Sequence, residues 1–103
     1  MLLLKLLQGE DMYGYQMIEE LERRSDRTFS LKAGTLYPLL HDLQRQGMID
    51  VYEKTAETGR LRKYYSLTKE GRQMLAVKEA EWSSFSAAVN QVLSGGGASL
   101  ATV

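Results

Sequence analysis

The chain has 103 residues, with 13 basic and 13 acidic side chains and a formal net charge of zero, and this length fits one domain. Hydrophobic residues make up 44% and charged residues 25%, close to the average of soluble globular proteins, which excludes wholesale disorder. The sequence contains no cysteine, which excludes disulfides, thiolate zinc sites and cysteine nucleophiles.

A short helix is predicted from Leu2 to Gln8, with Gly9 as its stop. The apolar run from Met1 to Leu7 is interrupted by Lys5 and is too short to span a bilayer, and no small-residue cleavage site follows it. The expected compartment is therefore the cytosol. The apolar stripe of this helix consists of Leu2, Leu3, Leu6 and Leu7.

A second helix is predicted to start at Asp11, as its N-cap, and to fade near Ser25. Its apolar residues recur with the spacing of one buried helix face. Because a glycine lies within this stripe, we expect the backbone to approach a neighbouring helix closely. The stripe consists of Gly14, Met17, Ile18 and Leu21.

A third helix is predicted from Lys32 to Gln46, ending at Gly47. Its apolar stripe consists of Leu36, Leu39, Leu40 and Leu43. Pro38 removes a backbone donor and crowds the carbonyl of Gly34, so we expect bent first turns or a late start. The outer face is small, aromatic and hydroxylic near its start, which indicates a functional surface. That face carries Gly34, Thr35, Tyr37, Pro38, His41 and Arg45.

A β-hairpin is predicted from strands at 48–54 and 61–67, joined by a polar tip that contains Gly59. Six basic side chains lie between Lys54 and Arg72, against two acidic ones, Glu57 and Glu70. This positive patch indicates a polyanion at one edge of the domain or, alternatively, an ordinary solvated basic loop.

A last helix is predicted from its N-cap Thr68 to about Leu93. It carries a heptad-like stripe that suits packing against a partner helix, although Lys78 breaks the apolar run. The stripe consists of Leu75, Lys78, Trp82, Phe85, Val89 and Val92. The glycine-rich tail, residues 94–103, is expected to be disordered.

Three motifs in this order resemble the PadR family of bacterial transcriptional regulators. They are Tyr13-Gly14-Tyr15, the run from Gly34 to Leu40 (GTLYPLL), and the run from Gly59 to Thr68 (GRLRKYYSLT) with Gly71. The resemblance covers about residues 1–93. It implies a mainly α fold with a small antiparallel hairpin: a winged helix-turn-helix DNA-binding domain at 1–67 and a C-terminal dimerisation helix at 68–93.

The resemblance also implies a cytoplasmic bacterial homodimer that binds operator DNA, usually as a repressor relieved by a small aromatic or cationic compound. The single C-terminal helix is similar to the small subgroup of the family. Family members usually carry several more residues before the first helix than this chain does. This difference bears on the dimer interface and on any DNA contact from an N-terminal arm.

In a winged helix the third helix enters the major groove and the hairpin meets the flanking backbone. Thr35 is expected to reach a base edge, and Tyr37 is expected to reach a phosphate or base or, alternatively, to pack against the second helix. The residues expected to face DNA from this helix are Lys32, Gly34, Thr35, Tyr37 and Pro38.

Three basic residues of the hairpin are expected to contact DNA. Arg60, beside Gly59, can enter a minor groove, whereas Arg62 and Lys63 can grip phosphates. Because strand side chains alternate, these two point to opposite faces, and one of them can instead pair with Glu53 or Glu57.

Trp82 is expected to face its own copy across a two-fold interface. Two indoles there would form either a slot for flat aromatic or cationic compounds or an ordinary dimer core. The residues expected at this interface are Leu75, Trp82, Phe85 and Val89.

A sequence-specific regulator is thus the predicted function, and the alternative is a winged-helix module that binds another protein. An enzyme is not expected, because no nucleophile–base pair, phosphate loop or metal cluster is present in the sequence. The single histidine, His41, with scattered carboxylates does not make a metal site, and no cofactor is expected.

Overall fold

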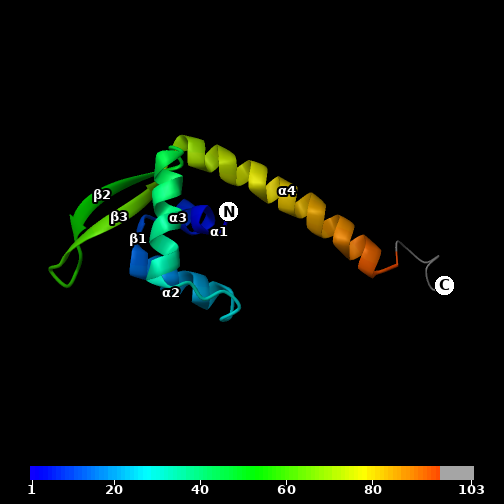
Figure 1. The fold of residues 1–103 in the computed structure, drawn as a ribbon, viewed down its shortest axis with the longest axis horizontal. Helices are drawn as coiled ribbons and strands as arrows, with labels where there is room; N and C mark the ends of the chain where they lie inside the picture. The colour runs from blue at the N-terminus through cyan, green and yellow to red at the C-terminus, as the bar shows by residue number, and fades with distance from the viewer. Residues whose placement is uncertain (96–103) are drawn as a thin grey trace.

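A computed structural model describes residues 1–95, and the last part of the predicted tail, residues 96–103, lies outside that range. Figure 1 shows a body of helices and strands from which one long helix projects. The elements in chain order are α1 (Leu2–Gly9), β1 (Met12–Tyr13), α2 (Gly14–Arg24), α3 (Ala33–Arg45), β2 (Ile49–Thr55), β3 (Leu61–Leu67) and α4 (Lys69–Leu93). This order confirms the predicted fold class, mainly helical with a small antiparallel sheet.

The sheet has three strands in the order β1-β3-β2, all antiparallel, so the predicted hairpin gains one further strand. Met12 and Tyr13 of β1 pair with Tyr65 and Tyr64 of β3. The prediction that Asp11 caps α2 is wrong, because this pairing holds the chain extended until Tyr13, which is the N-cap.

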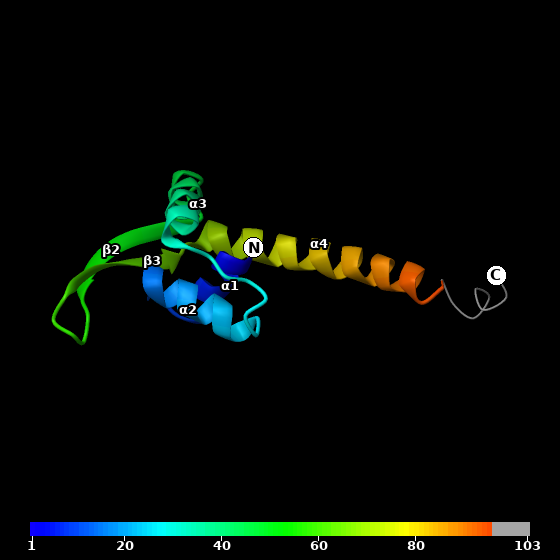
Figure 2. The same ribbon diagram turned by 60° about the horizontal axis from the view of Figure 1, so that its bottom comes forward.

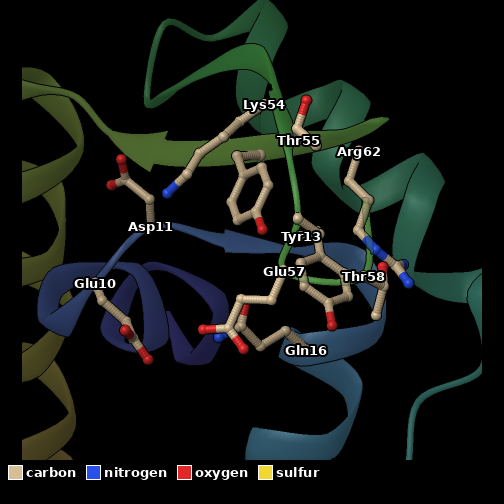
Figure 3. Close-up of a pocket in the computed structure, with 11 residues that line it drawn as sticks. Glu10, Asp11, Tyr13, Gln16, Lys54, Thr55, Glu57, Thr58 and Arg62 are labelled. Carbon is tan, nitrogen blue, oxygen red and sulfur yellow. The ribbon is translucent and has the colours of Figure 1, made fainter. Parts of the chain in front are cut away.

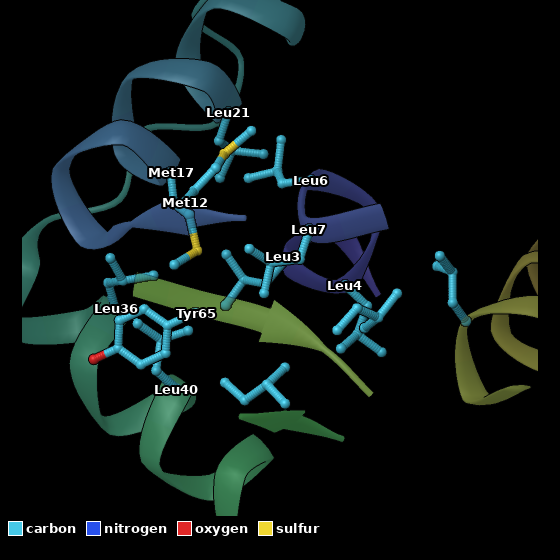
Figure 4. Packing of buried hydrophobic residues seen from close by; sticks show 13 residues of the cluster. Leu3, Leu4, Leu6, Leu7, Met12, Met17, Leu21, Leu36, Leu40 and Tyr65 are labelled. Carbon is cyan, nitrogen blue, oxygen red and sulfur yellow. The ribbon is translucent and has the colours of Figure 1, made fainter. Parts of the chain in front are cut away.

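The buried core lies where α1, α2, α3 and the sheet meet the first turns of α4 (Figure 4). It is entirely apolar apart from the Tyr65 hydroxyl, so its stability rests on burial and close packing. The core residues are Leu3, Leu4, Leu6, Leu7, Met12, Met17, Leu21, Leu36, Leu40, Ile49, Tyr65, Leu67 and Leu75.

Two helix stripes differ from the predicted ones by one residue each. In α1 Leu4 is buried, while Leu2 is among the exposed large apolar side chains. In α3 Leu36 and Leu40 are buried and Leu43 is half-buried, but Leu39 is exposed. The buried face of α1 is therefore rotated relative to the predicted face, and the buried face of α3 is narrower than the predicted one.

The predicted close approach at Gly14 is present and involves α3. A Cβ atom at position 14 would lie within 2.8 Å of Tyr37 Cζ and closer still to its hydroxyl oxygen. No real side chain tolerates such contacts, so glycine is what allows the Tyr37 ring to lie over the start of α2.

Pro38 lies inside α3, but the helix begins before it, at Ala33. The backbone N–H groups of Thr35 and Leu36 both donate to the carbonyl of Lys32, each at 2.9 Å. The expectation of a late start is therefore wrong. The missing donor lies in the helix interior on the exposed side, where water can meet the freed carbonyl.

The long helix α4 starts as predicted, with Thr68 Oγ1 accepting a hydrogen bond from Gly71 N–H at 3.0 Å. Its first two turns pack on the body, and Lys5 of α1 forms a 3.2 Å ion pair with Glu79. Beyond that point the helix extends away from the body, as Figure 2 shows from a second direction. The principal extents, 64 × 28 × 22 Å, reflect this projection.

Candidate nucleic-acid interface

The start of α3 presents the predicted outer face to solvent. Gly34, Thr35 and Pro38 are exposed, as is Lys32, the N-cap of the helix. No atom lies within 4 Å of the position that a Cβ on Gly34 would take. The start of α3 is therefore uncovered by the other elements within residues 1–95.

Tyr37 lies at the edge of this face and packs against α2 through Gly14. Its side chain nevertheless stays 40% exposed. The part of the Tyr37 ring nearest Gly14 therefore packs on α2, which was one of the two predicted alternatives. The rest of the ring remains accessible to solvent.

The wing, defined here as β2, β3 and the tip between them, carries the three predicted basic residues. Arg60 is exposed at the tip, next to Gly59, whose φ of +85° is readily adopted only by glycine. Lys63 is exposed on the core-facing side of β3, and Arg62 is half-buried on the opposite side. The predicted alternation of Arg62 and Lys63 is therefore present.

Arg62 has an aromatic partner that the sequence did not reveal. Its guanidinium carbon lies 4.3 Å from the centroid of the Tyr13 ring. Its Nε is buried and has no hydrogen-bond partner. Within residues 1–95, neither Arg62 nor Lys63 forms an ion pair with Glu53 or Glu57, so both positive charges remain available to an external anion.

A tyrosine cluster supports this face of the sheet, and Figure 3 shows one of its members, Tyr13, with Arg62 beside it. Tyr64 stacks on Tyr52 at 5.8 Å and meets Tyr13 edge-on at 5.5 Å, and Lys54 lies 5.1 Å from the Tyr64 centroid. These contacts are of the kinds that stabilise exposed aromatic surfaces. Tyr64 is half-buried and Tyr65 is buried, so both serve to pack the sheet.

The cluster also tethers the wing to the segment between α1 and β1. Tyr52 donates a hydrogen bond to Asp11 Oδ2 at 2.6 Å. The negative carboxylate accepts the phenolic proton, so this bond is the main cause that raises the pKa of Tyr52. A cavity of about 450 Å³ lies between this segment and the wing tip, with Glu10, Gln16, Glu57 and Arg62 among its lining residues.

A second, smaller cavity of about 240 Å³ joins the two predicted DNA-facing elements, α3 and the wing, at the start of α2. It lies where the start of α2, the outer edge of α3 and strand β3 meet. Its lining residues are Tyr13, Gly14, Tyr37, Arg62, Lys63 and Tyr65. Two cationic residues, from opposite faces of β3, and three tyrosines thus line this cavity.

The far part of α4 carries an exposed apolar surface that we call the distal stripe, consisting of Trp82, Phe85, Val89 and Val92. Trp82 is 56% and Phe85 60% exposed, and their ring centroids lie 5.9 Å apart. Lys78, before the stripe, pairs with Glu81 at 3.6 Å. Such a contiguous apolar surface is typical of an interface.

Leu75 does not belong to this surface. It is 1% exposed and packs in the core of its own chain. A heptad-like spacing cannot distinguish the part of a helix that covers its own domain from the part that meets a partner. We therefore correct the predicted interface by assigning Leu75 to the core.

Comparison with known proteins agrees with this arrangement. The model of the transcriptional regulator PadR-like family matches residues 3–77. A PadR-like transcriptional regulator from Bacillus cereus superposes with a TM-score of 0.81 at 30% identity, covering 90% of this chain and 88% of that one. A PadR family transcription regulator from Clostridium difficile gives 0.77 at 34% identity, covering 89% and 94%.

Two relatives known by sequence differ in length. An uncharacterised protein from Lysinibacillus sphaericus is 29% identical over 94 residues, which are 91% of this chain and 86% of the relative. Transcriptional regulator YqjI from Escherichia coli is 32% identical over 75 residues, which are 73% of this chain but only 34% of that protein. The similarity to YqjI therefore concerns about a third of its length.

No helix within residues 1–95 combines the length and the apolar character needed to cross a membrane. The family match covers most of the chain and includes α3, the wing and the first turns of α4. The chain belongs to the PadR-like family of transcriptional regulators, a family of regulators and not of enzymes.

Proposed function

We propose that this regulator is a homodimeric repressor that binds operator DNA through α3 and the wing and releases it on binding a small aromatic or cationic compound. The observation that carries the DNA-binding part is the cavity that brings the exposed Tyr37 of α3 together with Arg62 and Lys63 of the wing. A helix in the major groove beside a basic wing on the flanking backbone is the arrangement of winged-helix proteins.

The face of α3 carries no arginine, asparagine or glutamine in its first two turns. Strong bidentate readers of guanine or adenine are thus missing from these turns. Thr35 offers one hydroxyl and one methyl group to a base pair. We therefore propose that part of the specificity comes from DNA shape, read by Arg60 in a minor groove.

The distal stripe supports the homodimer. Two aromatic and two aliphatic side chains lie along one side of α4, and among residues 1–95 all four stay exposed. In a two-fold dimer the stripe of one copy covers that of the other, and two DNA-binding bodies are then linked. The two α3 helices would contact half-sites about one helical turn apart.

The ligand part of the proposal concerns Trp82, the single tryptophan of the chain. With its neighbour Phe85 it offers aromatic faces on which a flat compound can stack and which attract a cation. Since no other indole contributes, tryptophan emission reports on this site alone. Quenching by a panel of aromatic cations is the expected result, and constant emission across the panel would contradict the ligand site.

The DNA part is tested by fluorescence anisotropy with a duplex from the promoter of the regulator's own gene and a random duplex, over a series of salt concentrations. We expect tighter binding to the promoter and a steep loss of affinity with salt for both duplexes. Replacing both Arg62 and Lys63 by alanine should weaken both complexes and flatten the salt dependence.

The matched control replaces Arg23 and Arg24, at the far end of α2, by alanine. Both pair with Glu20 and lie away from the wing, so this variant also loses two positive charges but should keep its DNA affinity. Weak and equal binding of the wild type to both duplexes, and to duplexes selected from random sequence, would favour the alternative function of a protein-binding module.

A further inference from the structure

Arg62 is held in an unusual setting for a wing residue that is expected only to grip phosphates. Its guanidinium group lies against the Tyr13 ring, and its Nε is buried without a hydrogen-bond partner. A cation that stacks on an aromatic ring keeps its outer N–H groups free while losing much of its rotational freedom. Arg62 is thus positioned before any partner binds.

Tyr13 is fixed in turn by the sheet. It pairs with Tyr64 in the register of β1 and β3, and the two rings meet edge-on. Directly after Tyr13 the chain turns into α2, whose first turn has no side-chain cap. Backbone N–H groups at such a helix start favour phosphate oxygens.

We propose that the 240 Å³ cavity beside Arg62, called here the phosphate pocket, takes one backbone phosphate of bound DNA, and that Tyr13 is the positioning residue that holds Arg62 for it. The proposal rests on the proposed DNA-binding function. It adds a specific phosphate site and, in Tyr13, a lining residue of that site that acts through Arg62.

The other lining residues fit a phosphodiester. Lys63 supplies a second cation from the same strand, and Tyr37 supplies a phenolic donor from α3. Gly14 allows that phenol to lie over the start of α2, since any side chain there would displace it. None of the six lining residues is acidic, so no carboxylate of the lining repels an anion there.

A double-mutant cycle on DNA affinity tests the proposal. The variants are Tyr13→Leu, Arg62→Ala and the combination, measured on the same duplex by anisotropy. If Tyr13 acts through Arg62, Tyr13→Leu should weaken DNA binding roughly three- to tenfold in the protein that keeps Arg62. In the Arg62→Ala background the same substitution should change the affinity very little. Equal losses in both backgrounds, or no loss beside Arg62, would overturn the positioning role while leaving the proposed function intact.

Two further variants separate positioning from folding. Tyr13→Phe keeps the ring and should bind DNA like the wild type, whereas Arg62→Lys keeps the charge but loses the planar stack and should bind more weakly. Arg62→Ala should flatten the plot of log DNA affinity against log salt concentration, lowering its slope by about one for each phosphate contact that is lost. An unchanged slope would overturn the phosphate contact.

Tyr52→Leu is the matched control for damage to the sheet, because it removes a stacked tyrosine of the same face whose ring lies against no arginine among residues 1–95. With far-UV circular dichroism unchanged, it should keep its DNA affinity. A loss equal to that of Tyr13→Leu would assign the effect to the sheet and overturn the proposal. Failure of the wild type to bind any duplex would instead overturn the proposed function, and the phosphate pocket with it.

Discussion

The body of the protein and the distal half of α4 use apolar side chains in opposite ways. In the body, the core leucines and methionines of α1, α2 and α3 are almost completely buried by their own chain. Along the distal stripe, Trp82 and Phe85 are more than half exposed. The body therefore holds its own core, whereas the distal stripe is complete only when something outside the chain covers it.

The largest expected effect is on the stability of the body. Leu40 on α3 is one of the largest fully buried side chains, and Leu40→Ala leaves a cavity that should cost about 2–5 kcal/mol of the free energy of unfolding. Urea unfolding at several protein concentrations measures this loss. A loss below about 1 kcal/mol would mean that α3 packs less tightly than the structure shows.

A somewhat smaller effect is expected at Gly71, where α4 leaves the body. A Cβ there would lie 2.6 Å from Leu67 Cδ1 and closer still to the carbonyl oxygen of Met48. Gly71→Ala should therefore destabilise the fold by about 1–3 kcal/mol through overpacking. The control Gly34→Ala, in open space on α3, should be neutral or stabilising, as alanine favours helix.

The next effect concerns the distal stripe and should depend on concentration. Phe85→Ala removes no buried contact of the body, so the unfolding of a single chain should hardly change. In the dimer the same change should weaken association by about 1–2 kcal/mol. Thermal melts over a hundredfold range of protein concentration separate the two cases, because only a dimer melts at a concentration-dependent temperature. Identical melts at all concentrations would count against the dimer.

The smallest effect lies on the surface of the body. Arg23 and Arg24 donate hydrogen bonds to Glu20 and lower the pKa of its carboxyl from 4.5 to about 2. A lowered folded-state pKa stabilises the fold above the unfolded value, and this contribution is lost as the pH falls from about 4.5 towards 2.

Glu20→Gln should therefore lower the urea midpoint slightly at neutral pH, since exposed ion pairs contribute little. The difference from the wild type should shrink between pH 5 and pH 2. A difference that stays constant over that range would show that the ion pairs with Arg23 and Arg24 are not its source.

Most of the fold could be predicted from the sequence because its elements carry strong local signals. The apolar periodicity of α2 and α3, the glycine after α3 and the cap at Thr68 each mark an element boundary. Strand β1 could not be predicted in this way. Two residues carry no periodicity, and their pairing depends on a strand 50 residues later in the chain.

The candidate site was predictable in its residue types but not in its contacts. Exposed residues at the start of α3 and basic residues of the wing follow from helical and strand alternation. The contact of Arg62 with Tyr13 depends on the same unpredicted strand, β1. Leu75 was misassigned because spacing does not tell a helix's own core from a partner's surface.

The most direct test of the whole account is the composition of the DNA complex. Native mass spectrometry of the full chain with a duplex selected from random sequence measures it in one experiment. The predicted result is two chains on one duplex, because the distal stripe joins two bodies and each body contacts one half-site. This complex should be lost when the residues of the distal stripe are replaced by polar ones. A complex of one chain per duplex, or a dimer that binds no duplex, would contradict the account.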